Sequence, residues 1–124
     1  MTAEDVYKAA LALIFEDEQT AGDYKTFSPA LINLLLPGLF SVNNAIREAR
    51  GKEPLTELPR VSAFTDEIPY EDDLVIGAMP YGLAEKLVYD DMDMDKVGYF
   101  NSQYVNAVNA LTQVKPQDIE DVYA

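Results

Sequence analysis

Two stretches of apolar residues at helical spacing, on either side of an acidic break, constrain this chain more than any other feature. The stripe residues are Ile76, Met79, Leu83 and Leu87 in the first stretch, then Val97, Phe100, Tyr104, Ala107, Val108 and Leu111 in the second. Each stripe is the pattern of an amphipathic helix. The break at 90–95, DDMDMD, is too acidic to be buried. The pattern therefore predicts two antiparallel helices joined by a short exposed link.

The length and composition predict one folded domain. The chain has 124 residues, of which 48% are hydrophobic, and this is ordinary for a globular protein. We expect a single helical domain over 1–124 that is all-α: a small four- to five-helix bundle with kinked helices and a long proline-rich connecting segment. The end of the chain, 114–124, predicts either a short last helix that begins at Pro116 or a flexible arm.

The chain contains no cysteine and no histidine. This excludes disulfides, thiolate nucleophiles, zinc sites built on these residues and imidazole acid–base chemistry. Close pairs of carboxylates such as Glu71 and Asp72 arise by chance in so acidic a chain, and no glycine-rich phosphate loop is present. We therefore expect no enzyme and no cofactor.

Asp91, Asp93 and Asp95 match the first three ligand positions of an EF-hand calcium loop. The match fails at the two diagnostic positions, because Lys96 stands where glycine is needed and Ser102 where a bidentate glutamate is needed. An acidic turn with a helix cap at Asp93 or Asp95 is the favoured interpretation. A weak surface cation site, or a metal-dependent enzyme at 90–95, is the less favoured alternative.

The net charge is −13, from 22 acidic and 9 basic residues. Such a surface repels phosphate backbones and anionic headgroups. We therefore expect no sequence-specific binding of nucleic acid and no binding to a membrane. The longest apolar run, Ala9 to Phe15, is far below the roughly 20 residues of a membrane span, and Glu4 and Asp5 stand where a signal peptide would be basic. Three interpretations of this charge are open. It keeps the protein soluble, it complements a basic partner surface, or it forms an acidic lining past which nucleic acid slides.

A first helix is predicted from Ala3 to Phe15, with Thr2 as its N-cap and Asp5 as the capping-box partner. Residues 9–15 are apolar nearly all round, so they are expected to be buried on most sides or covered by a partner chain. Residues 16–27 are expected to form a polar loop.

A second helix is predicted to begin with Ser28 as N-cap and Pro29 at its first position. Pro37 lies inside the apolar pattern and should bend this helix without dividing it. Gly51 is the expected stop.

Residues 51–69 contain three prolines and are expected to lie extended over the surface, with a short strand at 60–64 as an alternative. The expected anchors are Leu55, Leu58, Val61, Phe64 and Ile68. A third helix should follow near Tyr70 and be kinked or divided at Gly77 and Pro80, and a fourth should run from Asp95 to Gln113.

Tyrosines gather in and beside the central pair of helices: Tyr70, Tyr81, Tyr89, Tyr99 and Tyr104. Amphipathic core packing explains such a pattern, and so does an interface, where tyrosine is enriched. The candidate interface residues are Tyr81, Tyr89, Asp90, Asp91, Asp93, Tyr99 and Tyr104.

Four stretches of the sequence carry a family resemblance. They are LINLLLPGLFSVNNAIREARGKEPL (31–55), DEIPYEDDL (66–74), MPYGLAEKLVYDDMD (79–93) and YFNSQYVNAV (99–108). They are similar to the head-to-tail connector proteins (neck or head-completion proteins) of tailed phages and prophages. The resemblance spans 28–108, and its motifs are short and built from common residues.

The resemblance implies an all-helical core and a structural role. Connector subunits form a ring at the virion neck, bind the portal protein on one side and a tail or stopper protein on the other, and are present in the host bacterial cytoplasm during assembly. A cyclic ring joins different patches of the same chain. A second hypothesis, drawn from the charge alone, is a soluble acidic adaptor or inhibitor that binds a basic protein partner.

Overall fold

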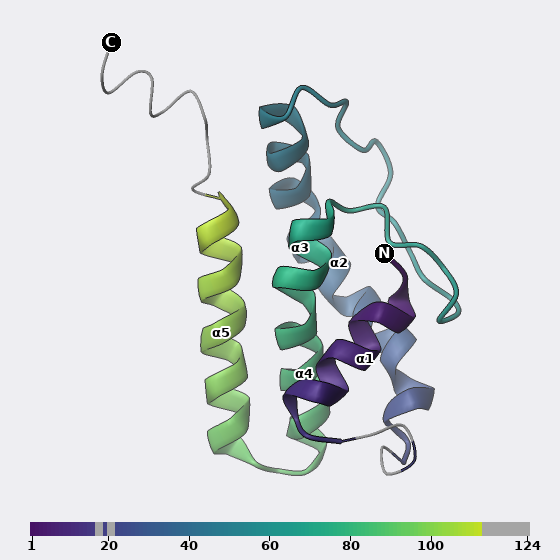
Figure 1. Ribbon diagram of the computed structural model, residues 1–124, viewed down its shortest axis with the longest axis vertical. Helices are drawn as coiled ribbons and strands as arrows, with labels where there is room; N and C mark the ends of the chain where they lie inside the picture. Colours follow the sequence, from purple (N-terminus) through teal and green to yellow (C-terminus); the bar gives the residue numbers. More distant parts are fainter. Residues whose placement is uncertain (17–18, 20–21, 113–124) are drawn as a thin grey trace.

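The protein is all-α, as the sequence predicts. The structure, a computed structural model, describes residues 1–16, 19 and 22–112. Its helices are α1 (Ala3–Leu13), α2 (Tyr24–Ala49), α3 (Asp72–Gly77), α4 (Met79–Asp90) and α5 (Met94–Thr112). Figure 1 shows α4 at the centre, with α5 on one side of it, α1 on the other and α2 crossing behind. The expected last helix or arm at 114–124 lies outside the described residues.

The antiparallel pair predicted around the acidic break is α4 and α5, which lie side by side in Figure 1. The amide N–H of Lys96 donates to the Asp93 carboxylate at 3.3 Å, so Asp93 is the cap of α5. Phe100 is buried, while the remaining stripe residues of α5 are half-buried against the core. One stripe residue was placed wrongly: Ile76 lies on α3 and is exposed.

The capping box predicted at the start of α1 is confirmed. The backbone N–H of Asp5 donates to Thr2 Oγ1 at 3.2 Å, and the backbone N–H of Thr2 donates to Asp5 Oδ2 at 2.9 Å. The helix ends at Leu13. This end lies two residues before the predicted one. Ala10 and Leu11 of the apolar run are buried, as is the C-cap Ile14, whereas Phe15 is exposed.

The predicted start of α2 is wrong. The helix begins at Tyr24, so Ser28 and Pro29 lie inside it and part of the expected 16–27 loop is helical. Ser28 is buried, and its hydroxyl donates to the carbonyl of Tyr24 at 2.6 Å. A serine that bonds back to the preceding turn is compatible with a helix interior, so the residue type that suggested a cap has a different role here.

The prediction of one bent helix with Pro37 inside it is confirmed: α2 is continuous and changes direction along its length in Figure 1. Proline has no N–H to give to the carbonyl of Asn33. Beside it, the buried Tyr70 hydroxyl donates to the carbonyl of Leu36 at 2.6 Å. Gly51, with φ of 76°, follows the helix as expected.

Residues 50–71 connect α2 to α3 without a helix. Two asparagines of α2 hold this connection, each through a pair of bonds to one residue: Asn33 to the N–H and carbonyl of Val61 (2.8 and 2.7 Å), and Asn44 to those of Leu55 (2.8 and 3.1 Å). The prediction that Leu58 anchors this segment is wrong, because its side chain is exposed. No strand forms at 60–64; the extended contact is instead an isolated bridge between Thr2 and Glu67.

The third predicted helix is divided into α3 and α4 at Ala78, between Gly77 and Pro80, as expected. One hydrophobic cluster includes residues from all five helices and from the connecting segment.

The helix α2 is long and apolar enough to cross a membrane, by length and composition alone. The core helix of a soluble protein passes the same test.

Candidate functional site

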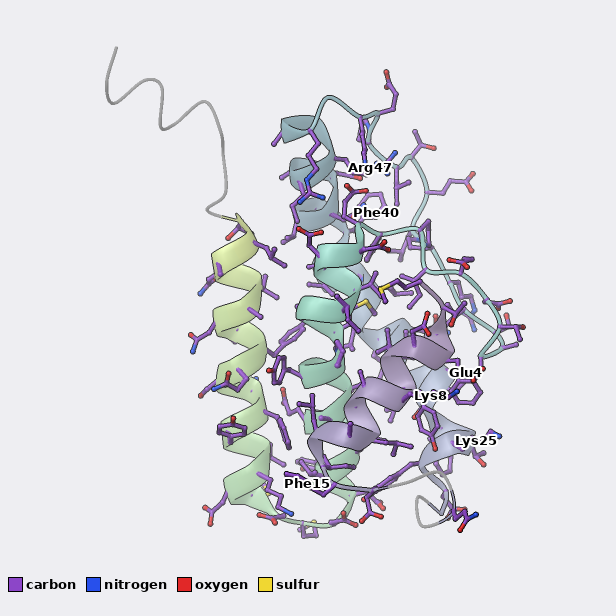
Figure 2. All side chains as sticks on the ribbon, in the orientation of Figure 1. Glu4, Lys8, Phe15, Lys25, Phe40 and Arg47 are labelled. Atoms are coloured by element: carbon purple, nitrogen blue, oxygen red, sulfur yellow. The ribbon has the colours of Figure 1, made fainter. Side chains whose placement is uncertain are left out.

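Exposed apolar side chains gather at one end of the bundle, where the chain leaves α1, enters α2 and turns from α4 into α5. Ten large apolar side chains are exposed among the described residues, and six of them lie here: Phe15, Phe27, Tyr89, Met92, Met94 and Tyr99. We call these six residues and the acidic residues between them the end surface. Figure 2 shows Phe15 at this end and Arg47 toward the opposite end. Such a concentration is typical of an interaction surface.

Two hollows open on the end surface. The first, about 390 Å³, lies between the start of α2 and the end of α4 and is lined by Asp23, Tyr24, Phe27, Leu31, Lys86, Leu87, Tyr89 and Asp90. The second, about 280 Å³, lies between the end of α1 and the start of α5 and is lined by Leu13, Ile14, Phe15, Asp95, Lys96, Tyr99 and Phe100. Both linings are mostly apolar, and each is large enough for an apolar side chain of a partner.

Acidic groups outnumber basic ones around these hollows. The acids are Glu16, Asp23, Asp90, Asp91, Asp93 and Asp95, against Lys25, Lys86 and Lys96. Lys96 Nζ lies 3.7 Å from the carboxylate of Asp93, the cap of its own helix. The surface therefore combines apolar anchors with an excess of negative charge.

A hydrogen bond joins α2 to the link between α4 and α5 at this end. The Tyr24 hydroxyl donates to Oδ2 of Asp91, which ties the start of α2 to the link between α4 and α5. Burial, followed by the hydrogen bond to the Asp91 carboxylate, raises the pKa of Tyr24 above its ordinary value. The tyrosine stays a proton donor, so the wall of the first hollow is fixed by a charged hydrogen bond.

The structure brings five of the seven candidate residues together and separates two. Tyr89, Asp90, Asp91, Asp93 and Tyr99 lie on the end surface. The other two, Tyr81 and Tyr104, are half-buried and pack against the core, as the core-packing interpretation of the tyrosines expects. Phe15 and Phe27 were not among the candidate residues, although the apolar run ending at Phe15 indicated that a partner could cover it.

A second polar cluster, toward the other end of α2, was also missed. Glu71 is only 6% exposed, and its carboxylate lies 2.9 Å from Lys52 Nζ, 3.0 Å from Arg50 Nη1 and 3.3 Å from Arg47 Nη1. Its N–H donates to Asn43 Oδ1 at 2.7 Å. The available signal was compositional, since three of the nine basic residues fall within 47–52.

The Glu71 cluster serves the fold. The hydrogen bonds of Lys52 first and Arg50 next lower the pKa of Glu71 against the opposing effect of burial. Arg50 also bonds Asp73 at 2.7 Å, and Arg47 Nε donates to the carbonyl of Glu53 at 2.6 Å. These contacts hold the connecting segment and the start of α3 against the end of α2.

Within the described part of the chain, no group of three or more histidine, cysteine, aspartate or glutamate residues is placed to hold a metal ion. The fold and the end surface thus define a small all-α protein with an acidic, aromatic candidate docking surface. Comparisons with models of protein families, with curated proteins and with solved structures found no match.

Proposed function

We propose that this chain is a non-enzymatic phage structural protein that joins the portal and head to the tail as a subunit of a ring at the virion neck. The observation that carries the proposal is the end surface, where six exposed apolar side chains surround two hollows. A protein whose role is to be held between other proteins needs such a surface. The resemblance of 28–108 to connector proteins supplies the class of assembly.

A ring subunit also needs a surface for its own copies, and one face of α2 suits that purpose. Residues 26–46 contain no charged residue, although the chain as a whole has 31 in 124 (9 basic and 22 acidic). The exposed residues of this stretch include Ala30, Leu34, Pro37, Gly38, Ser41 and Ala45. Copies of net charge −13 repel one another, so an uncharged face is where they approach most easily.

The remaining acidic surface fits the passage of DNA through such a ring. Carboxylates repel phosphate groups, so DNA would slide past an acidic wall without adhering. Binding of the portal above and of a tail or stopper protein below would then fall to the apolar surfaces.

The test is quantitative mass spectrometry of purified particles induced from the source strain, with this chain counted against the major capsid protein. The proposal expects a low, fixed copy number that corresponds to one ring per particle. Complete absence from particles, with the chain present only in the cytosol, would sink it.

The excess of acids around the hollows also favours a second candidate, a soluble acidic adaptor or inhibitor of a basic protein. Binding through these carboxylates should weaken as salt is raised. A pull-down from the cytosol that is unchanged between low and high salt would count against the adaptor.

A further inference from the structure

Three helices of this protein end in the same way, with the residue after the C-cap in the left-handed conformation. These residues are Phe15 after α1 (φ 60°), Gly51 after α2 (φ 76°) and Met92 after α4 (φ 58°). The bonds that accompany this ending are present: the N–H groups of Phe15, Gly51 and Met92 donate to Ala12, Glu48 and Tyr89 at 3.0–3.2 Å. Glycine is the usual residue at this position, and of these three helices only α2 is followed by one.

Contacts within the protein do not explain why Phe15 and Met92, rather than glycine, stand at these two positions. A side chain with a β-carbon is disfavoured in the left-handed region, where glycine is not. Burial could offset this, but Phe15 is 95% exposed and Met92 is 73% exposed. Their backbone is strained, and the side chains held by that strain face solvent, a combination typical of functional positions.

Both residues lie on the end surface, whereas Gly51 lies at the opposite end of the fold. Phe15 lines the second hollow, and Met92 is in the link between α4 and α5. Aromatic residues and methionine are enriched in interfaces, and methionine adapts its shape to a partner. Large apolar side chains therefore replace glycine only at the end that carries the hollows.

We propose that the end surface binds a basic amphipathic segment of a partner protein, whose apolar side chains enter the two hollows and pack against Phe15 and Met92, while its lysines or arginines meet the surrounding carboxylates. This rests on the proposed function and names the chemistry of the partner. Six carboxylates against three lysines give the complementary charge.

The charge also argues against two other occupants. A second copy of the chain carries the same net charge of −13, and the segment 113–124 has one lysine and three acids. Either would bring negative charge to a negative surface. A basic partner is the occupant that both the apolar hollows and their acidic rims accept.

The first test uses Phe15→Gly and Met92→Gly, which remove the side chains and suit the backbone. The probe is a synthetic amphipathic peptide of lysine, leucine and phenylalanine, and its twin has glutamate in place of lysine. We expect each variant to melt at the same or a higher temperature than the parent and to bind the lysine peptide about tenfold more weakly. The twin should not bind.

The matched control is Leu58→Ser, because Leu58 is also an exposed apolar residue but lies in the connecting segment, outside the end surface. It should bind the lysine peptide as the parent does. Undiminished binding by both glycine variants would overturn the proposal. So would a fall in their melting temperatures, since the side chains would then serve the fold.

The second test places a photo-crosslinking benzophenone amino acid at position 15 or, as control, at 58 in the induced source strain. The proposal expects position 15 to capture a segment with net positive charge and apolar residues at helical spacing. Capture of an acidic segment, of this chain, or of nothing would overturn it. A basic segment from a protein absent from particles would uphold the binding chemistry and refute the connector role, so the two proposals fail separately.

Discussion

The ring of Tyr104 on α5 lies directly on Gly82 of α4. A β-carbon built at position 82 would come within 2.9 Å of Tyr104 Cε1 and 3.0 Å of Leu35 Cδ2, closer than real side chains approach. The missing side chain lets α4 meet α5 on one face and α2 on another. Gly82 therefore sets the spacing of the three helices, and Tyr104 fills the space that glycine leaves.

Substitution Gly82→Ala should destabilise the protein by about 1–3 kcal/mol, because a methyl group is forced between packed side chains. The measurement is the free energy of unfolding in urea, followed by circular dichroism. Gly98→Ala is the control: nothing lies within 4 Å of a β-carbon there, so better helix propensity should stabilise α5 by about 0.5–1 kcal/mol. Equal effects at the two positions would show that helix propensity, and not spacing, governs Gly82.

Glu71 holds three cations in place, and its loss should loosen the connecting segment. We expect Glu71→Gln to destabilise the fold by about 1–3 kcal/mol, less than a fully buried pair would, since Arg50 and Lys52 are partly solvated. Asp73→Asn removes only the exposed bond to Arg50 and should cost less than half as much. Chemical denaturation of both variants compares them, and the reverse order would disprove the central role of Glu71.

The same cluster predicts an acid dependence. The pKa of Glu71 is lowered in the fold from its ordinary 4.5, so its contribution to stability is complete above that value. It is lost as the pH falls through the lowered pKa. The Glu71→Gln variant should therefore lose less stability than the parent when the pH is taken below 4.5. Parallel curves for the two proteins would contradict this assignment.

Sequence signals predicted the features of the fold that depend only on neighbouring residues. The Thr2 capping box, the bend at Pro37, the division near Ala78 and the cap at Asp93 each depend on a few neighbouring residues. The start of α2 was predicted wrongly because a serine is consistent with both a cap and a helix interior. Pro29 lies in the second turn of the helix, where it gives up the bond to the carbonyl of Lys25. The contacts that decide between a cap and an interior, such as the bond from Ser28 to Tyr24, are visible only in the structure.

The end surface was predictable in part. Tyr89, Tyr99 and the acidic link are close in the sequence. Their position at one end of the bundle follows from the antiparallel arrangement of α4 and α5. Phe15 and Phe27 come from distant parts of the chain and join them only through the packing of α1 and α2. The spacing placed Tyr104 in the apolar stripe, but the space that its ring fills depends on the absent side chain of Gly82, which no spacing predicts.

Asn33 holds the connecting segment through both of its amide atoms, which makes its substitution by aspartate informative. Asn33→Asp keeps the oxygen that accepts from the Val61 N–H but loses the donor to the Val61 carbonyl. The unpaired carbonyl and the new charge should destabilise the protein by about 1–3 kcal/mol. Hydrogen exchange should quicken around Val61. The exposed Asn101, which bonds Glu85, is the control, and Asn101→Asp should leave the exchange at Val61 unchanged.

Tyr70 should make the protein sensitive to alkali. Burial, with a smaller effect from Tyr104, raises the pKa of Tyr70 from 10.0 to about 12. Between these values the folded protein keeps the proton while the unfolded chain releases it, so stability falls as the pH rises, by up to about 1.4 kcal/mol per pH unit for one such group. Tyr70→Phe loses the bond to the Leu36 carbonyl and should be less stable at neutral pH. It should also lose stability less steeply above pH 10.0, measured by urea unfolding monitored through circular dichroism. A variant whose stability falls as steeply as that of the parent would assign the alkaline transition to Tyr24 and Tyr104, whose pKa values burial also raises.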